Sequence, residues 1–316
     1  MNPDESRKVV SEAARAQGLD PRGAVLIQGG PTTNHTFRLP ESGAIAKVFA
    51  PGTRHEEALR EMRVGQWLRG EGIRAPRPVG RDPYPVQRET RRHVLQINFV
   101  QDLGTGRATA AQFGVLLRKL HSLEVPRRLA LPVFDPVTTL SMRIATLPPG
   151  TLTPGEDRRA RAILAEARTA WKSAALTACT GAVHGDVGLA NSAVGQGGEP
   201  GLIDFERTAL GPRQWDLAAF AWRRDIYGAD PAEYQQFTSA YGADVTTHDD
   251  GRTYAAMTPV LALSAMLTAA DFARAEPAWR HEAGLRRRTA LADPLPPFPW
   301  DWRIGRDAEV PVEAAL

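Results

Sequence analysis

The feature that most constrains the fold of this chain is a change of pattern near residue 100. Before it, short apolar runs bounded by glycine, proline and asparagine predict strands. After it, long stretches with apolar residues at helical spacing dominate. The strands are expected over residues 24–28, 36–39, 44–49 and 93–100. Helices are expected over residues 6–17, 55–69, 110–123, 157–178, 215–227, 231–241 and 253–276. We therefore expect an α+β protein with a β-rich first third and a helical remainder.

The composition is that of a soluble globular protein with a core of its own. The chain has 316 residues, of which 42% are hydrophobic and 24% charged. Its single cysteine, Cys179, allows no intrachain disulfide and no cysteine-based zinc site, which suits the cytoplasm. The apolar runs look too short to span a bilayer. The formal net charge is +3 with bases and acids interleaved, so we expect no nucleic-acid partner. The run 286–288, three arginines, is expected to be a solvated helix face.

Two short motifs carry the chemistry. The first covers residues 183–191 (VHGDVGLAN) and the second covers residues 202–206 (LIDFE). Phosphoryl transfer needs a carboxylate that orients the acceptor, and oxygen ligands for Mg²⁺. Asp186 and Asn191 supply a carboxylate and an amide oxygen in one loop, and Asp204 supplies a carboxylate at the end of a predicted strand. Each aspartate alone is typical of a turn. Together, their order and spacing favour a catalytic function.

These motifs resemble those of the aminoglycoside phosphotransferase and choline kinase family, relatives of the protein kinases, which carry H-G-D-x-x-x-x-N and I-D-[FW]-E. The resemblance implies a two-lobed protein-kinase-like fold with a small β-rich lobe and a larger helical lobe. It implies that Asp186 is the catalytic base and that Asn191 and Asp204 are metal ligands. His184 would be structural. Glu206 would either touch metal-bound water or anchor its loop.

The resemblance extends to the segment 211–218, which opens a predicted helix with a G-x-x-x-x-D-x-A pattern. Asp216 would stand at the start of that helix, where a carboxylate accepts backbone N–H bonds. We expect a structural role for Asp216.

A lysine in an apolar strand also calls for a partner. Only four of the 39 basic residues are lysines, and one of them, Lys47, lies in the predicted strand 44–49. A charged amine in such a strand needs an anionic partner or ligand. In the kinase pattern V-A-I-K, this lysine holds the ATP phosphates and pairs with a helix glutamate. Glu61 is the best match for that glutamate and Glu57 is the rival. The alternative is a solvated strand lysine.

The nucleotide is expected to contact two further segments. The turn at residues 29–34 takes the position of a loop whose backbone amides cradle phosphates. Asn34 matches a family asparagine that braces this loop. Residues 96–100 correspond to the hinge strand that meets adenine. The residues assigned to the nucleotide are Lys47, Glu61, Gly30, Thr32, Thr33, Asn98 and Val100.

By this resemblance the nucleotide-binding lobe covers residues 1–100 and the catalytic lobe residues 101–316, with a hinge about 98–104 and a helical insertion about 135–180. The expected function is transfer of the γ-phosphoryl group of ATP, or of GTP, with Mg²⁺ to a hydroxyl of a small molecule. No membrane is expected, and the protein would be a monomer or a homodimer.

The expected acceptor is an antibiotic, aminoglycoside-like or other, in resistance or biosynthesis, and an amino alcohol or a sugar is the alternative. The insertion contains four acidic and six basic residues, and this balance weakens the case for a polycationic aminoglycoside. Acids of later helices, Asp225, Asp230 and Glu233, remain as a negative wall. An aromatic cage for choline could be formed by Trp215, Trp222 and Trp279. We expect these three tryptophans to belong to the hydrophobic core instead. A catalytically silent nucleotide-binding regulator is the second class of function.

Overall fold

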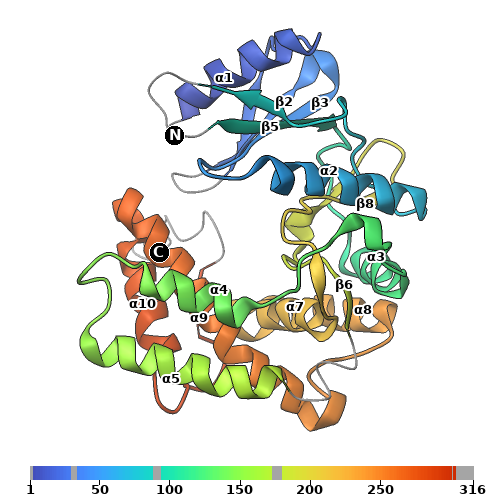
Figure 1. Ribbon diagram of the computed structural model, residues 1–316. Helices are drawn as coiled ribbons and strands as arrows, with labels where there is room; N and C mark the ends of the chain where they lie inside the picture. The colour runs from blue at the N-terminus through green and yellow to red at the C-terminus, as the bar shows by residue number, and fades with distance from the viewer. Residues whose placement is uncertain (1–2, 30–33, 88–93, 173–179, 301, 304–316) are drawn as a thin grey trace, which may run out of the picture. The chain divides into compact units, whose positions relative to one another are not determined.

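The structure, a computed structural model, describes residues 3–29, 34–87, 94–172, 180–300 and 302–303 (Figure 1). It forms two compact units. The first contains residues 1–131 and 189–208, and the second contains residues 132–188 and 209–316. The hinge expected about residues 98–104 stays a prediction.

A five-stranded antiparallel sheet forms the centre of the first unit. Its strand order is β1-β2-β3-β5-β4. The strands are β1 (Val25–Gln28), β2 (His35–Leu39), β3 (Ala44–Val48), β4 (Tyr84–Val86) and β5 (Leu95–Gln101). In the register of β3 and β5, Lys47 lies opposite Asn98. The predicted strands are thus present, and β4 is an additional edge strand.

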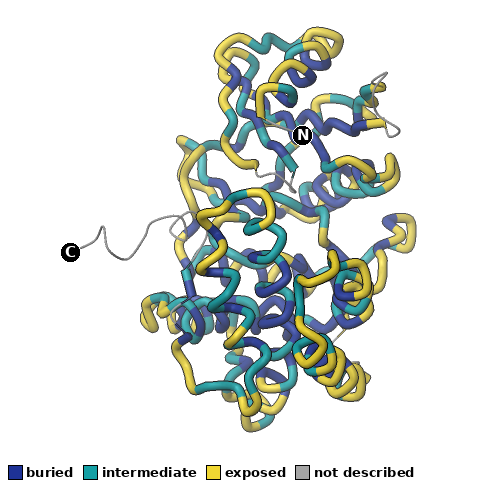
Figure 2. Tube along the Cα trace, turned by 90° about the vertical axis from the view of Figure 1, so that its left-hand side faces the viewer, coloured by how far each residue is buried: buried dark blue, intermediate teal, exposed yellow. Residues whose placement is uncertain are grey.

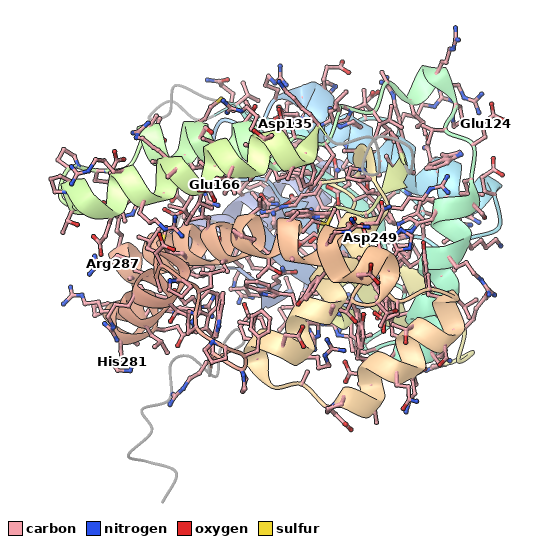
Figure 3. The ribbon with its side chains drawn as sticks, turned by 90° about the horizontal axis from the view of Figure 1, so that it is seen from below. Glu124, Asp135, Glu166, Asp249, His281 and Arg287 are labelled. Carbon is pink, nitrogen blue, oxygen red and sulfur yellow. The ribbon has the colours of Figure 1, made fainter. Side chains whose placement is uncertain are left out.

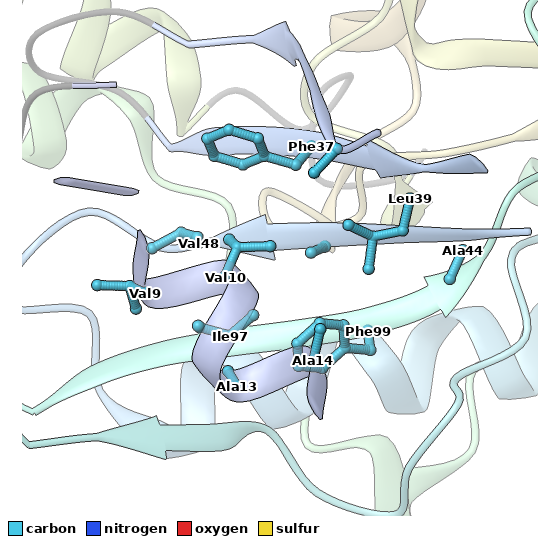
Figure 4. Close-up of a cluster of buried hydrophobic side chains, with 12 residues drawn as sticks. Val9, Val10, Ala13, Ala14, Phe37, Leu39, Ala44, Val48, Ile97 and Phe99 are labelled. Atoms are coloured by element: carbon cyan, nitrogen blue, oxygen red, sulfur yellow. The ribbon is translucent and has the colours of Figure 1, made fainter. Parts of the chain in front are cut away.

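Two helices cover the two faces of this sheet (Figure 1). Alternate residues of a strand point to opposite faces. The face that includes Phe37 and Ala46 packs against α1 (Pro3–Ala16), where Val10 is fully buried (Figure 4). The opposite face of β3, which carries Lys47, is the one that meets α2 (His55–Gly70). The pleat of β3 therefore separates the apolar core from a polar site.

The rest of the first unit is a helix and a short hairpin. Helix α3 (Ala110–Ser122) begins with a capping box in which the Thr109 side chain accepts from Gln112 N. It contacts β8 (Pro200–Leu202), which pairs antiparallel with β7 (Ser192–Val194). Short 3₁₀ turns are η1 (Pro40–Ser42), η2 (Arg127–Leu129) and η3 (Leu189–Asn191).

The second unit is mainly helical. Helix α9 (Arg252–Ala275) lies at its centre, because it contacts four other helices of the unit. These are α4 (Pro136–Ala145), α5 (Pro154–Trp171), α7 (Gln214–Tyr227) and α10 (Arg280–Ala290). The remaining elements are α8 (Pro231–Tyr241), η4 (His248–Gly251), η5 (Pro277–Trp279) and the strand pair β6 (Thr180–Val183) and β9 (Ala209–Pro212). Buried residues, dark blue in Figure 2, follow the inner sides of these helices.

One helical stretch of the second unit, His248–Ala275, is long and apolar enough to cross a membrane by length and composition alone. The sequence analysis had expected apolar runs too short for this. A central helix of a globular unit passes the same test, and 44% of the apolar window is buried. The contacts of α9 with its neighbouring helices account for its apolar character.

The expectation for the arginines at 286–288 was wrong for Arg286. Its guanidinium is 5% exposed and pairs with the buried Glu282, Nε to Oε1 at 2.7 Å. The two residues are one turn apart on α10, so the helical period turns them to the same inner face. Arg288, two residues further, is exposed as expected. The three tryptophans expected in the core, Trp215, Trp222 and Trp279, are buried.

Candidate functional site

The lysine of β3 is the centre of a charged cluster in the first unit. Lys47 Nζ lies 3.0 Å from Glu61 Oε1 on α2 and 2.6 Å from Asp204 Oδ1, which follows β8. Glu206 Oε2 lies 3.1 Å from the same nitrogen. The rival glutamate, Glu57, instead pairs with Arg54 at the start of α2. Side chains from a strand, a helix and a loop thus meet at the ammonium group of Lys47, a residue that is only 9% exposed.

The cluster holds one positive and three negative groups, and this imbalance appears in the pKa values. Burial by itself lowers the pKa of Lys47, but the charges of Glu61, Asp204 and Glu206 outweigh it and raise this pKa above its ordinary value. Burial raises the pKa of Glu61 to about 7, against the attraction of Lys47 and with repulsion from the two acids. The cluster therefore has an excess of negative charge that a further cation would relieve.

The loop after β8 brings two of the predicted metal ligands to one place. Asn191 directly precedes β7 and Asp204 closely follows β8, and the two strands form an antiparallel hairpin. Ile203 N donates to Asn191 O at 3.1 Å, so both segments lie at the same open end of the hairpin. Asp204 has a φ of 66°, in the left-handed region that aspartate tolerates better than most residues. This backbone conformation accompanies the contact of its carboxylate with Lys47.

Glu206 is braced as well as charged. Its carboxylate accepts a hydrogen bond from Asn34 Nδ2, and Asn34 Oδ1 accepts from Ala50 N at 2.8 Å. Asn34 therefore ties the segment before β2, the end of β3 and the loop after β8 together. The neighbouring positions predicted to contact phosphates, Gly30, Thr32 and Thr33, lie outside the described residues.

A cavity of about 250 Å³ opens beside this cluster within the first unit. Its polar wall contains Lys47, Glu61 and Asp204. Its other walls are mostly apolar and come from all around the unit: Ile27, Ile45, Val100, Ala193, Ile203 and Phe205. A charged end and apolar walls together fit a ligand with a phosphate chain and an aromatic base.

The two predicted hinge residues both line this cavity. Val100 lies opposite Ile45 in the sheet. Asn98 is 2% exposed, and its Nδ2 donates to Ala58 O at 2.9 Å, one turn before Glu61 on α2. Asn98 Oδ1 is buried and has no hydrogen-bond partner among the described residues. Asn98 thus fastens the helix that carries Glu61.

The sequence analysis missed an ion pair at the end of β5. Arg38 Nε lies 2.6 Å from Asp102 Oδ2, and both residues line the cavity. Asp102 Oδ1 also accepts from Gly104 N at 2.8 Å. Gly104 has a φ of 114°, and a Cβ there would come within 2.6 Å of Gly195 Cα, so only glycine fits. No motif announces this pair, because it joins residues that are 64 positions apart.

The loop with the predicted catalytic base belongs to the second unit. It follows β6, and Asp216, in the first turn of α7, is fully buried beneath it. The Asp216 carboxylate accepts from His184 N at 2.6 Å and from Gly185 N at 2.9 Å. Gly185 has a φ of 81°, which glycine adopts without strain, and Asp186 directly after it is exposed. Asp216 therefore shapes the loop that presents Asp186 to solvent.

The carboxylates around Lys47 are of the chemical type that Mg²⁺ prefers. Among the described residues, no group of three or more His, Cys, Asp and Glu side chains is arranged as a ready metal site. Magnesium is commonly held by only one or two carboxylates together with substrate phosphates. The carboxylates of Asp204 and Glu206, which both lie within 3.1 Å of Lys47 Nζ, are groups of that chemical type. The excess negative charge around Lys47 supports the same assignment.

Two comparisons of the sequence with known proteins found similar ones. A family model described as "Phosphotransferase enzyme family" matches residues 25–260. A protein of Deinococcus radiodurans, described as uncharacterized, is 27% identical in an alignment of 238 positions that covers 71% of this chain and 68% of the relative.

Among solved structures, amicoumacin kinase hAmiN in complex with AMP-PNP, Ca²⁺ and Ami is similar with a TM-score of 0.66, at 14% identity over 95% of this chain and 99% of that one. Spectinomycin phosphotransferase APH(9)-Ia with ADP and spectinomycin has a TM-score of 0.60, at 15% identity over 95% and 97%. A choline/ethanolamine kinase family protein of Mesorhizobium loti has a TM-score of 0.59, at 17% identity over 92% and 94%. These similarities confirm the predicted α+β, protein-kinase-like fold.

Proposed function

Because this chain belongs to the phosphotransferase enzyme family, we propose that it is a small-molecule kinase that uses ATP and Mg²⁺. It moves the γ-phosphoryl group to a hydroxyl of its acceptor. The observation that carries this proposal is the Lys47 ammonium held by Glu61 and Asp204 at the charged end of a cavity. A structural lysine would need one carboxylate, whereas this one is surrounded by three.

The nucleotide is assigned to the cavity of the first unit. Lys47 binds its phosphates, and Glu61 keeps the ammonium in place. Gly30, Thr32 and Thr33 are the proposed phosphate contacts, and Val100 packs against the base. Asn98 contributes by fastening α2, which carries Glu61. Residues 1–100 would then act as the nucleotide lobe and residues 101–316 as the catalytic lobe. ATP is the favoured nucleotide, and GTP is the alternative.

Asp204 and Asn191 are the proposed metal ligands, with Glu206 beside them. The ion would neutralise charge on the phosphates during transfer. In the absence of the ion Lys47 offsets part of the same negative charge, which explains why these carboxylates can lie together. Asn34 holds Glu206 in position through its amide.

Asp186 is the proposed base. Its exposed carboxylate accepts the proton of the acceptor hydroxyl and aims the oxygen at the γ-phosphorus. The role of Asp216 is to hold the backbone of the loop, so that little reorganisation is needed at the moment of reaction. The phosphoryl group leaves ADP and forms a new bond to the acceptor oxygen.

For the acceptor we propose an antibiotic, because two structurally similar kinases have spectinomycin and amicoumacin in their descriptions. An amino alcohol or a sugar is the second candidate, since choline kinases share the fold. A catalytically silent nucleotide-binding regulator is the third candidate. Phosphoryl transfer to any acceptor would exclude it. The proposed location is the cytoplasm, where ATP is available.

The test is transfer of ³²P from [γ-³²P]ATP to a panel of hydroxylated antibiotics, sugars and amino alcohols. The proposal expects a labelled acceptor with Mg²⁺, no product with Asp186→Ala, and unchanged AMP-PNP binding by that variant. Binding of ATP without product from any acceptor would instead identify a regulator.

A further inference from the structure

Helix α7 presents two functional side chains to the loop of Asp186. Asp216 and Arg223 are seven residues apart, which is close to two helical turns, so they share one face of the helix. Asp216 holds the loop at His184 and Gly185. At the other end of this face, Arg223 Nη1 lies 3.9 Å from the point that a Cβ on Gly188 would occupy. The guanidinium of Arg223 therefore lies beside the loop, near the residue two positions after Asp186.

The charge of Arg223 is only loosely balanced. Its nearest recorded carboxylate is Glu233, at 3.9 Å from Nη2, which is beyond hydrogen-bond distance. The Nε atom is buried and has no hydrogen-bond partner within the described part of the chain. The side chain is 26% exposed, so solvent or a ligand reaches part of the guanidinium. Such a group has spare donors for an oxygen-rich ligand.

Two of the three acids expected to form a negative wall are engaged elsewhere in the second unit, and the third, Glu233, is the one that lies 3.9 Å from Arg223. Asp225 binds Arg224 through both carboxylate oxygens, at 2.5 and 3.0 Å, and accepts from Tyr254 Oη at 2.7 Å. Asp230 caps α8 by accepting from Ala232 N.

Further acids of this unit are no more available as a group. Asp135 caps α4, and Asp157 pairs with Arg161 on α5. Asp135, Glu166 and Asp249 lie on three separate elements and do not gather into one patch (Figure 3). A polycation would therefore find no concentrated negative charge among these acids, whereas an anion would find Arg223.

We infer that Arg223 is an acceptor-binding residue and that the acceptor carries a carboxylate or another oxyanion near the hydroxyl that is phosphorylated. The inference rests on the proposed kinase function and names the class of its acceptor. Gly188 has no side chain that would fill the space beside the guanidinium. Glu233 is too distant to accept hydrogen bonds from Arg223, so a bound oxyanion would accept them instead. The position next to the Asp186 loop places the anionic group close to the reacting hydroxyl.

The test compares three six-carbon probes that differ in one end group: D-gluconate with a carboxylate, D-sorbitol with a hydroxyl and D-glucamine with an amine. Binding to the full chain is measured by calorimetry with AMP-PNP and Mg²⁺ present. A charged hydrogen bond to the guanidinium should make gluconate bind about tenfold more tightly than sorbitol. Arg223→Met should remove this preference, and Arg223→Lys should keep part of it. Arg288→Met, which removes an equal charge from an exposed position, should leave the preference intact.

Tightest binding of glucamine, equal or absent binding of all three probes, or a full preference in Arg223→Met would overturn the inference. If Arg223→Met does not fold, the relative affinities of the three probes for the wild type and for Arg223→Lys still test the inference. The binding assay needs no turnover, so its result is separate from that of the kinase proposal. A gluconate preference without phosphoryl transfer to any acceptor would refute the kinase alone, and transfer without the preference would refute the role of Arg223.

Discussion

Replacing Asp216 by asparagine is the sharpest test of how the loop of Asp186 is built. The carboxylate is fully buried and accepts two backbone N–H groups, at 2.6 and 2.9 Å. An asparagine keeps one acceptor oxygen but turns an NH₂ group toward the second N–H. One charge-assisted hydrogen bond is lost and one buried donor is left without an acceptor, at a cost of about 1.5–3 kcal/mol. Since 1.4 kcal/mol is a factor of ten, the loop should open about 10 to 100 times more often.

Hydrogen exchange of the amides of His184 and Gly185 measures this opening directly. We expect their exchange in Asp216→Asn to be faster by that factor, and phosphoryl transfer to fall because Asp186 loses its fixed position. The matched control is Asp230→Asn, an exposed cap of α8 where asparagine is as good an acceptor as aspartate. Unchanged exchange in Asp216→Asn, or an equal increase in both variants, would refute the reasoning.

Three further predictions concern the first unit. Lys47→Met should weaken AMP-PNP binding in calorimetry by about tenfold or more, because the phosphates lose a charged donor and meet unbalanced acids; unchanged affinity would contradict the assignment. The pKa of Glu61, raised to about 7 from 4.5, means that the folded state holds this proton more tightly. Its contribution to stability is therefore full below pH 4.5 and is lost as the pH rises toward 7, so the urea midpoint should fall more between pH 5 and 8 in the wild type than in Glu61→Gln. Phe37→Ala, at a fully buried position, should cost about 3–5 kcal/mol of unfolding free energy, whereas Val115→Ala at an exposed position should cost under about 0.5 kcal/mol in the same urea titration.

The elements that could be predicted are those whose pattern is local. The strands and α2 follow from periodic apolar residues, and the contact of Lys47 with Glu61 follows from a charge in an apolar strand facing a helix. Of helix α10 only a solvated face at the arginines 286–288 was predicted, and its bounds were not, because its eleven residues include four arginines and few apolar side chains. Arg286 is buried there only because Glu282 and the rings of Trp279 and Trp302 surround it. A sequence pattern does not contain such a tertiary partner.

The same limit applies to the site. The spacing of Asn191 and Asp204 indicated a shared function, and the hairpin of β7 and β8 brings their segments together. The brace of Glu206 by Asn34 joins residues that are 172 positions apart, and the place of Arg223 beside Gly188 depends on how α7 packs. These contacts arise from the fold. The sequence therefore indicated which residues could take part in chemistry, but not which of them contact one another.

The most direct test of the central claim is the effect of Mg²⁺ on AMP-PNP affinity, measured by calorimetry for the wild type and for Asp204→Asn. If Asp204 holds an ion that bridges the phosphates, Mg²⁺ should strengthen binding to the wild type by about tenfold or more, and this gain should disappear in the variant. Equal affinities of the wild type with and without Mg²⁺, or the same gain in both proteins, would contradict the account.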